Sequence, residues 1–370
     1  MVKIVIGANF GDEGKGLMTD YFASRMGGNG VVVLSNGGTQ RGHTVVNNGR
    51  RHVFHHFGSG TFNYYDTYCP RQFIVNPIIY TKEKAELQYK YEFNESIYMH
   101  PECRITTPWD MMANQIIESG RIDRHGSCGM GIWETIKRDK VIPLRYKDEI
   151  TKKFIQDIRD YYRKRFEEEG ITESAYHNLF FGSDDLIYRF MLDFDYMFED
   201  VIISREDMIE DCDNIIFENG QGLLLDGDNE EYQPHTTPSK TGLHNPSMIL
   251  KEIDLRPKQD IEVCYVTRSY LTRHGAGKMP SEVNKESICW KIGADKTNTT
   301  NEWQGSLRYG FIDTDPLLKR VKFDFDKYAP KGAKLSIAIT HLNEYWPEWA
   351  YEIGDYFSDS ETTVTKRGDK

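Results

Sequence analysis

The chain has 370 residues, a formal net charge of −11, 39% hydrophobic residues and 28% charged residues, as is typical of a folded soluble protein. The acidic balance argues against a broad nucleic-acid interface, which usually needs a basic patch. The cysteines are scattered without a CxxC pair, so they suggest neither a zinc site nor a disulfide framework. With no apolar stretch near 18 residues and no signal-peptide pattern, we expect a cytoplasmic protein without membrane or nucleic-acid partners.

The chain opens on an apolar run rich in β-branched residues at 2–6, followed by a glycine-rich turn and a helix-like segment at 17–23. This order predicts a strand, a phosphate-type loop and a helix. A second apolar run at 31–34 precedes another glycine-rich turn at 36–43. Because the two loops are so close in the sequence, we expect them to converge on one ligand.

Charged segments at 151–169 and 184–208 predict helices packed outside the sheet. Further strands are predicted at 214–218, 261–267 and 335–340, each ending at a glycine-rich or polar turn. Ligands of an open parallel sheet bind beyond the carboxyl ends of its strands. The sequence thus predicts one large α/β domain over residues 1–354, with a mainly parallel central sheet, flanking helices and inserted subregions. A polar tail at 355–370 is expected to fray.

Residues 11–16 read Gly-Asp-Glu-Gly-Lys-Gly, in which glycines let backbone N–H groups approach phosphate oxygens and Lys15 supplies charge. This is not a Walker A loop, because Asn9 occupies the position of its first glycine and Gly16 follows the lysine. A tight turn with solvated charges is the alternative interpretation. Asp12 weighs against it, because a carboxylate among phosphates is repelled unless it binds magnesium or removes a proton.

The second loop ends in Gly42-His43-Thr44, which supplies an imidazole able to donate to a developing oxyanion. A lone histidine is more often structural, but this glycine-rich setting favours catalysis. Residues 11–16 match the signature of adenylosuccinate synthetases and 42–44 match their second loop, so the chain resembles that family. Further matches to the family lie at 59–60, 126–131, 221–226 and 272–277.

The resemblance implies a Mg²⁺-dependent ligase that uses a nucleoside triphosphate to join L-aspartate to C6 of a 6-oxopurine nucleotide, through a 6-phosphoryl intermediate. Asp12 would remove the purine N1 proton and contact Mg²⁺, and His43 would assist phosphoryl transfer to O6. Gly42 would offer its carbonyl to Mg²⁺. The predicted catalytic residues are Asp12, Lys15, His43 and Gln221. The loop residues assigned to the triphosphate are Gly11, Asp12, Glu13, Gly14, Lys15, Gly16, Gly42, His43 and Thr44.

The monophosphate substrate is expected to meet a second set of residues. Ser127 and Cys128 replace a Thr-Thr pair of the cellular enzymes, and Gln221 would read the purine near O6 or N7. A polar turn with local side-chain bonds explains each residue alone equally well. The family usually forms homodimers in which a neighbour lends an arginine to the phosphate. The residues assigned to this substrate are Gln40, Ser127, Cys128, Arg138 (as that arginine), Gln221, Thr236 and Thr237.

Two segments depart from the cellular enzymes. Their aspartate loop contains an arginine run near the ribose 2′-hydroxyl, whereas here only Arg308 remains as a bidentate carboxylate partner, together with Thr299, Thr300 and Asn301. Their guanine-reading Thr-Lys-Leu-Asp segment corresponds to residues 340–343, which include His341 and Asn343. Because an asparagine amide both donates and accepts, it suits adenine, so we expect ATP or dATP rather than GTP.

Both departures resemble the phage branch of the family, the N6-succino-2-amino-2′-deoxyadenylate synthases, which act on dGMP in making diaminopurine DNA. Several members of that branch carry Ser where this chain has Asp12, so the chain would be an intermediate form that keeps the base of the cellular enzymes. If it is phage-encoded, it would work in the host cytoplasm. We expect dGMP as the substrate, with IMP and GTP as the alternative. A nucleotide-binding switch is a third reading, against which Asp12 and His43 argue, because a switch needs no proton chemistry.

Overall fold

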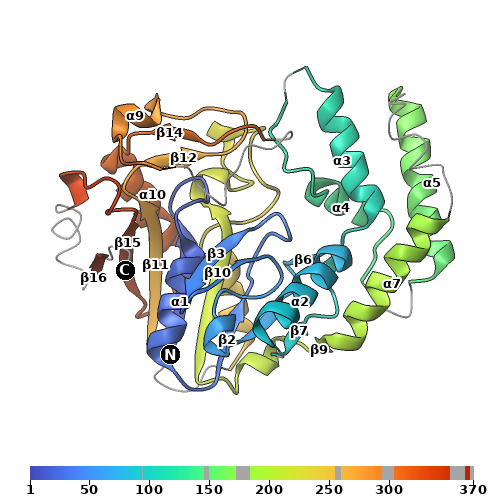
Figure 1. Ribbon diagram of the computed structural model, residues 1–370, viewed down its shortest axis with the longest axis horizontal. Helices are drawn as coiled ribbons and strands as arrows, with labels where there is room; N and C mark the ends of the chain where they lie inside the picture. The colour runs from blue at the N-terminus through green and yellow to red at the C-terminus, as the bar shows by residue number, and fades with distance from the viewer. Residues whose placement is uncertain are drawn as a thin grey trace.

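A nine-stranded sheet forms the centre of the protein, and every pair of neighbouring strands in it is parallel (Figure 1). The computed structural model describes residues 1–93, 95–122, 124–145, 150–171, 184–254, 260–293, 304–350 and 363–366. Across the sheet the strands are, in order, β16 (Thr363–Lys366), β15 (Lys334–Thr340), β11 (Ile261–Arg268), β1 (Val2–Gly7), β10 (Asn214–Gly222), β2 (Gly30–Val33), β5 (Asp66–Cys69), β7 (Ile97–Met99) and β9 (Ile202–Ile203). The predicted α/β fold with a mainly parallel central sheet is confirmed.

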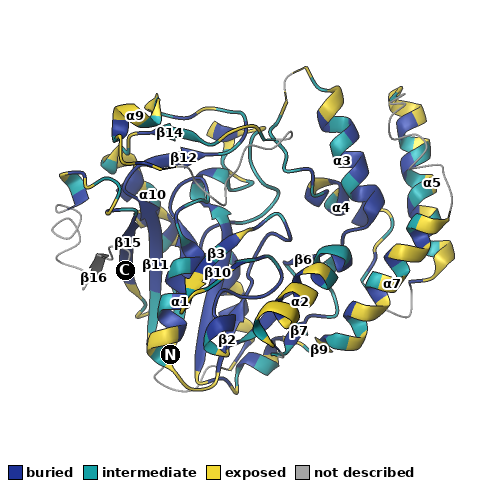
Figure 2. Ribbon diagram, in the orientation of Figure 1, coloured by how far each residue is buried: buried dark blue, intermediate teal, exposed yellow. Residues whose placement is uncertain are grey.

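The central strand β1 is apolar at almost every position because both of its faces are covered. Ile4 lies opposite Phe217 of β10 on one side and Val263 of β11 on the other. Ile4 belongs to the core on one face of the sheet and Val5 to the core on the other, since successive side chains of a strand point to opposite faces. Figure 2 accordingly shows the central strands as buried.

Helices supply the apolar side chains that cover these two faces. The α-helices of the described residues are, in chain order, α1 (Lys15–Met26), α2 (Pro77–Tyr91), α3 (Pro108–Gly120), α4 (Ile132–Asp139), α5 (Lys152–Glu169), α7 (Asp185–Asp200), α8 (His244–Glu252), α9 (Lys285–Ile288) and α10 (Thr314–Tyr328). Of these, α9 belongs to a separate apolar cluster, with Tyr270 and Ile292. Met18 of α1 packs in the core that contains Val5, whereas Ile249 of α8 and Leu317 of α10 pack in the core that contains Ile4.

The charged middle of the chain forms α5 and α7, which lie beyond one edge of the sheet in Figure 1. The inward face of α7 is spaced at three or four residues, as an amphipathic helix requires, and consists of Ile187, Phe190, Phe194 and Met197. The prediction of helix up to residue 208 is wrong beyond Asp200. The β-branched run at 201–203 favours extended backbone instead, and Ile202–Ile203 forms β9.

The three later strand predictions are confirmed: 214–218 lies in β10, 261–267 in β11 and 335–340 in β15. The polar tail differs from a wholly frayed segment, because Thr363–Lys366 forms β16 and pairs with β15. Threonine and valine favour extended backbone, which is consistent with this pairing. The remainder of the tail lies outside the described residues.

A small antiparallel hairpin, β3 (His43–Asn47) and β4 (Arg50–Phe54), follows the second glycine-rich loop. Its turn uses Asn48 and Gly49, whose φ angles of 49° and 80° suit a tight two-residue hairpin. The hairpin therefore fixes the place of His43, the first residue of β3. The other short strands are β6 (Ile74–Val75), β8 (Arg104–Ile105), β12 (Leu271–Arg273), β13 (Glu282–Val283) and β14 (Arg308–Gly310).

A buried carboxylate joins the end of this hairpin to α2. Glu83 accepts the backbone N–H groups of His55 at 2.8 Å and His56 at 2.7 Å. Burial alone would raise the pKa of the Glu83 carboxyl, but the imidazoles of His52 and His56 hold it below its usual range. Burial also lowers the pKa of His56 below its ordinary 6.5, so this imidazole is neutral at neutral pH.

We therefore expect the free energy of unfolding to fall as the pH is lowered from about 7.5 to about 5.5. Below its ordinary pKa of 6.5 the unfolded chain binds a proton at His56 that the folded chain excludes, and one such group contributes a slope of up to about 1.4 kcal/mol per pH unit. The stability from Glu83 is lost only further down, below its ordinary pKa of 4.5. Urea unfolding of the wild type and His56→Asn measures this dependence. An equally steep slope in His56→Asn would contradict the assignment.

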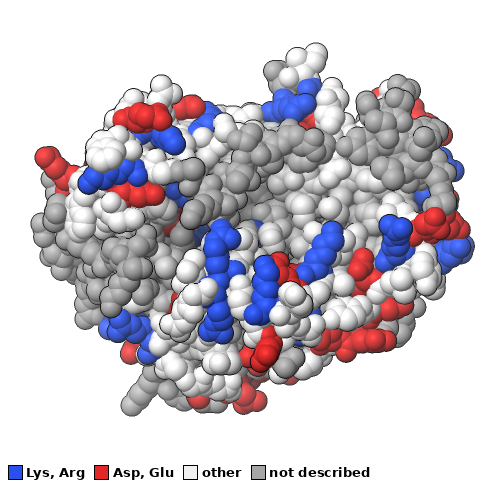
Figure 3. Space-filling view, in the orientation of Figure 1, with Lys and Arg blue, Asp and Glu red and all other residues white. Residues whose placement is uncertain are grey.

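Among the described residues, no helix is long and apolar enough to cross a membrane. On the face shown in Figure 3, basic and acidic side chains are intermixed. The loops that gather at one end of the sheet are those that follow β1, β2, β10, β11 and β15. Because parallel neighbours end at the same edge of a sheet, these loops surround a common region.

Candidate active site

A cavity of about 640 Å³ lies among these loops, a volume typical of small-molecule sites. The structure brings both glycine-rich loops to this cavity, although they leave different strands. The predicted site residues that line it are Gly11, Asp12, Gln40, Gly42, His43, Ser127, Cys128, Gln221, Thr236 and Thr237. Segments separated by more than 200 residues in the sequence therefore meet at one surface.

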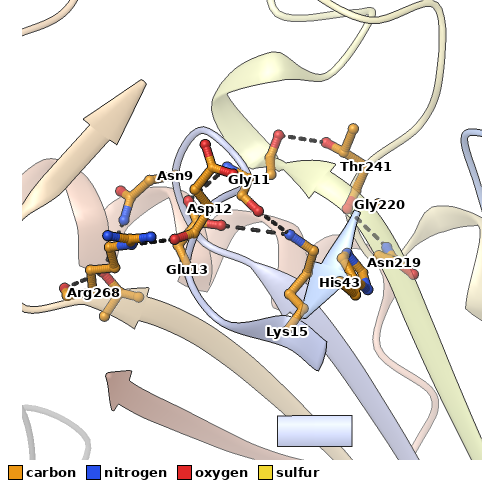
Figure 4. Close-up of polar contacts among 12 residues, drawn as sticks. Asn9, Gly11, Asp12, Glu13, Lys15, His43, Asn219, Gly220, Thr241 and Arg268 are labelled. Atoms are coloured by element: carbon orange, nitrogen blue, oxygen red, sulfur yellow. Dashed lines mark hydrogen bonds and ion pairs between the residues drawn. The ribbon is translucent and has the colours of Figure 1, made fainter. Parts of the chain in front are cut away.

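The first loop wraps around the buried side chain of Lys15 (Figure 4). Its Nζ donates to the carbonyl of Gly11 at 2.6 Å and lies 3.7 Å from Oε2 of Glu13, which also accepts the Gly11 N–H through Oε1 at 2.8 Å. Burial lowers the pKa of Lys15 and raises that of Glu13. The helix begins at Lys15 directly after Gly14, whose φ of 92° suits glycine. A lysine without bulk water at a helix start is well placed for phosphate oxygens.

Asp12 lies at the cavity wall with its side chain partly exposed. The guanidinium of Arg268, at the end of β11, donates through Nε to the backbone carbonyl of Asp12 and approaches the loop from the side opposite Lys15 (Figure 4). Across the cavity, Nε2 of His274 lies 3.9 Å from Oδ2 of Asp12. The sequence interpretation did not assign His274 to the site, although it lies within the matched segment 272–277.

His43 is held from behind by a buried charge network. Its Nδ1 lies 2.6 Å from Oε1 of Glu218, and Nη2 of Arg41 lies 2.7 Å from Oε2 of the same carboxylate. Burial and then the Arg41 charge lower the pKa of His43 to about 4, so the imidazole is neutral at neutral pH. Burial alone would raise the pKa of Glu218, but Arg41 and His43 hold it well below its usual range. Sequence reasoning missed both Glu218 and Arg41.

Two amide side chains that line the cavity carry polar atoms without a hydrogen-bond partner among the described residues. In the described part of the chain, neither amide atom of Gln40 has a hydrogen-bond partner, and Oε1 of Gln221 has none. A Cβ built on Gly37 would lie 3.2 Å from Nε2 of Gln40 and 3.3 Å from Oε1 of Gln221, so the two amides lie close to the same glycine. Because buried polar atoms normally have partners, these amides are suited to a polar ligand edge.

Four of the predicted monophosphate residues, Ser127, Cys128, Thr236 and Thr237, lie on two neighbouring segments of the wall, because Nδ1 of His235 is 3.1 Å from the carbonyl of His125. Ser127 donates its hydroxyl proton to Oδ1 of Asn114 at 2.8 Å, and the N–H of Gly126 donates to Glu118 at 2.7 Å. Both of these groups are therefore engaged within the chain. Thr236 and Thr237 also line the cavity, on the segment after His235.

Arg138 is not part of this cavity, and the prediction that it reaches a phosphate of a neighbouring subunit is wrong. Its side chain is fully buried, with Nε bound to Oδ1 of Asp110 at 2.8 Å. Its Nη1 donates to the carbonyl of Ile142 at 2.7 Å and its Nη2 to that of Ile105 at 2.8 Å. Every guanidinium nitrogen thus forms a hydrogen bond within the chain, and the Arg138 side chain joins α3 to α4.

The predicted aspartate site is only partly placed. Thr299, Thr300 and Asn301 lie outside the described residues. Arg308 does not line the cavity, because its Nε and Nη2 bind the two carboxylate oxygens of Glu282 and its Nη1 donates to the carbonyl of Gly277 at 2.8 Å. For Arg308 to bind a substrate carboxylate, it must first release Glu282.

The residues predicted for the donor base lie at the end of β15, next to the first loop. Thr340 donates its hydroxyl to the carbonyl of Glu13 at 2.8 Å and contacts Nδ1 of His341 at 2.8 Å. Neither His341 nor the exposed Asn343 lines the cavity. Thr44, which pairs with Val53 in the hairpin, does not line the cavity either.

Few groups at the cavity could bind a magnesium ion, but those that could are oxygen ligands, which Mg²⁺ prefers. Among the described residues, no group of three or more His, Cys, Asp or Glu side chains could hold a metal. Mg²⁺ is usually bound by one or two protein oxygens together with substrate phosphates. The carboxylate of Asp12 and the carbonyl of Gly42 border the same cavity and fit that pattern.

A strand, a glycine-rich loop around a buried lysine and a helix, opening onto a cavity with a carboxylate and an imidazole, define a nucleotide-binding α/β enzyme. The sequence profile of the adenylosuccinate synthetase family matches residues 4–323. The chain belongs to the adenylosuccinate synthetase family, and it is a C–N bond-forming ligase that joins aspartate to a purine nucleotide.

Individual relatives are distant. The adenylosuccinate synthetase of Dichelobacter nodosus is 29% identical over 337 residues, which cover 86% of this chain and 73% of the relative. A solved adenylosuccinate synthetase from Plasmodium falciparum, fully ligated, has a TM-score of 0.69 at 18% identity and covers 92% of this chain and 77% of its own. The succinoaminodeoxyadenylate synthetase of cyanophage S-2L, bound to dGMP and dATP, has a TM-score of 0.63 at 13% identity and covers 98% and 91%.

Proposed function

We propose that the protein condenses L-aspartate with C6 of dGMP through a 6-phosphoryl intermediate, with ATP or dATP as the phosphate donor. The products are N6-succino-2-amino-2′-deoxyadenylate, ADP or dADP, and phosphate. The observation that carries the proposal is the convergence of Asp12, His43, Gln40 and Gln221 on one cavity beside the Lys15 loop. A site for the purine whose O6 accepts the phosphoryl group, a residue that takes its N1 proton and a triphosphate loop are the three parts that this reaction needs.

The residues would have the following roles in the reaction. Lys15 and the loop N–H groups hold the triphosphate, and Asp12 takes the proton from N1, so that O6 becomes nucleophilic. His43 would donate a hydrogen bond from a protonated Nε2 to the transferring phosphoryl group, and Gln221 with Gln40 would orient the purine edge. Bound Mg²⁺, held by Asp12 and the Gly42 carbonyl, would supply neutralisation of phosphate charge. Phosphate then leaves C6 as the aspartate amine attacks, which replaces the C–O bond by a C–N bond.

Two features favour the phage-type substrates over IMP and GTP. In structural superpositions the chain covers 91% of the cyanophage enzyme, a protein bound to dGMP and dATP, but 77% of the Plasmodium adenylosuccinate synthetase. The donor-base segment ends in the exposed Asn343, whose amide can pair with adenine. The adenylosuccinate synthetase reaction with IMP and GTP is the second candidate, supported by the carboxylate of Asp12, the base expected of the cellular enzymes.

Mass spectrometry of the products tests this assignment. The protein is incubated with Mg²⁺, L-aspartate and either ATP, dATP or GTP, in the presence of dGMP, GMP, IMP or dIMP. We expect a succinylated product from dGMP with ATP or dATP. Product only from IMP with GTP would establish the second candidate, and absence of product from every pair would contradict both.

The aspartate site and the oligomeric state are part of the same proposal. Arg308 would bind a substrate carboxylate by exchanging Glu282 for it, together with Thr299, Thr300 and Asn301. We propose a homodimer, as the family resemblance implies, and light scattering at several protein concentrations tests it. Because Arg138 is buried, any arginine lent by a partner subunit must be another one.

A further inference from the structure

The imidazole of His43 is fixed by a carboxylate that comes from a distant part of the chain. Glu218 stands in the middle of β10, 175 residues from His43, and its side chain is fully buried. The 2.6 Å separation of Nδ1 and Oε1 requires a proton between them, because two acceptors do not approach that closely. His43 therefore carries a proton on Nδ1, and Nε2 is the nitrogen left to face the cavity.

The carboxylate of Glu218 is in turn held on all sides. Arg41 contacts Oε2 at 2.7 Å, and Ser59 donates its N–H to Oε2 at 3.1 Å and its hydroxyl to Oε1. Arg41 also lies 2.8 Å from Nδ1 of His43, but a guanidinium cannot accept a proton, so the Nδ1 proton points to Glu218. The network thus leaves Glu218 one role toward His43, that of acceptor.

Burying this ion pair costs solvation energy that the pair only partly recovers. Arg41 is 2% exposed and Glu218 is 0% exposed, and burial of such pairs is often neutral or unfavourable compared with apolar packing. What the pair does provide is a fixed ring plane and a fixed tautomer for the one imidazole that it touches. Catalytic histidines in other enzymes are held by buried carboxylates for this purpose.

We propose that Glu218 is the positioning residue of His43, and that Arg41 and Ser59 keep its carboxylate in place, so that Nε2 of His43 meets the transferring phosphoryl group. The inference rests on the proposed function for the role of His43, whereas the tautomer follows from the contacts alone. Glu218 does not touch the substrate. Its effect on the reaction passes through the imidazole.

A double-mutant cycle tests the coupling. Glu218→Gln keeps the size of the side chain but removes the charge, and we expect kcat to fall roughly 10²- to 10⁴-fold. The KM values for nucleotide and aspartate should change less than about threefold, because the substrate contacts remain. In a His43→Ala background, Glu218→Gln should cause little further loss. Multiplicative losses in the double mutant would overturn the proposal.

Nitrogen-15 NMR of the histidine side chains gives a readout that does not depend on activity. The wild type should show His43 in the Nδ1-protonated form, with its signals assigned by their loss in His43→Asn. In Glu218→Gln the signals should shift toward the other tautomer or a mixture. A wild-type His43 protonated on Nε2 would overturn the proposal even if the ligase reaction is found, and an inactive protein with the expected tautomer would count against the proposed function alone.

A matched variant separates positioning from folding. Glu83→Gln removes another fully buried glutamate that contacts imidazoles but does not line the cavity, and it should keep kcat within about threefold. If Glu218→Gln does not fold, Arg41→Gln combined with Glu218→Gln removes both charges of the pair and carries the cycle instead. Equal kcat losses in Glu83→Gln and Glu218→Gln would contradict a specific role for Glu218.

Discussion

Replacing Asp12 by asparagine is expected to lower kcat for nucleotide succinylation by roughly 10²- to 10⁴-fold, the usual contribution of a general base. The amide keeps the shape of the side chain, but it neither takes a proton from N1 nor offers a charged oxygen to Mg²⁺. Stability should change by less than about 0.5 kcal/mol, because the side chain is partly exposed and the contact with Arg268 uses the backbone carbonyl. Steady-state kinetics and urea unfolding measure the two effects.

A second carboxylate on a nearby loop supplies the control. Asp228 pairs with Lys240 at the surface and does not line the cavity, so Asp228→Asn should leave kcat unchanged within about twofold. His274, 3.9 Å from Asp12, gives a further check, since His274→Gln should impair the reaction less than Asp12→Asn does. Full activity in Asp12→Asn would rule out Asp12 as the proton acceptor.

The sheet and the loops could be predicted because their signals are local. Apolar runs of β-branched residues, such as residues 2–6 and 31–34, specify buried strands, and the glycines at 11, 14 and 16 mark a loop that approaches phosphate. The helix prediction failed past residue 200, where charge continues but β-branched residues take over. A prediction from periodicity alone does not take that change in backbone preference into account.

The charged network behind His43 could not be predicted in the same way, because its members are far apart in the sequence. Glu218 follows the apolar run Ile215, Ile216 and Phe217 within β10. Burying a carboxylate in such a strand costs free energy unless the carboxylate is paired. Its presence in an apolar run was therefore the one signal in the sequence that Glu218 has a partner. Its partner Arg41 sits between two residues that were assigned to the site, but no spacing rule connects positions 41 and 218.

Arg138 shows the opposite error, since it was assigned to the phosphate of a neighbouring subunit because it follows the loop at 126–131. The direction of a side chain on the short helix α4 depends on what the neighbouring helices offer. Asp110 of α3 and Tyr162 of α5 make a buried acceptor site, with the tyrosine hydroxyl 2.6 Å from Oδ1 of Asp110. A cation is needed there to balance the carboxylate, and the sequence pattern of α4 does not reveal this.

Arg138→Met is therefore expected to lower the free energy of unfolding by about 3–5 kcal/mol, the usual effect of leaving one partner of a buried ion pair uncompensated. The carboxylate of Asp110 would remain fully buried, and among the described residues its remaining hydrogen-bond donors would be the hydroxyl of Tyr162 and the N–H and hydroxyl of Thr107. Urea unfolding of the purified variant measures the loss. In the folded enzyme, the KM for the monophosphate should stay within about threefold of the wild type, because Arg138 does not reach the cavity.

The combined variant Arg138→Met with Asp110→Asn identifies the cause of that loss. The amide keeps an acceptor for the N–H of Thr107, which caps α3, but no longer leaves a buried charge unpaired. We expect it to recover at least half of the lost stability. The contrary outcome would be an Arg138→Met variant that is nearly as stable as the wild type and has a KM for the monophosphate raised more than about tenfold. The guanidinium of Arg138 in the wild type would then have to leave Asp110 and bind phosphate, and the buried position described here would not be the working one.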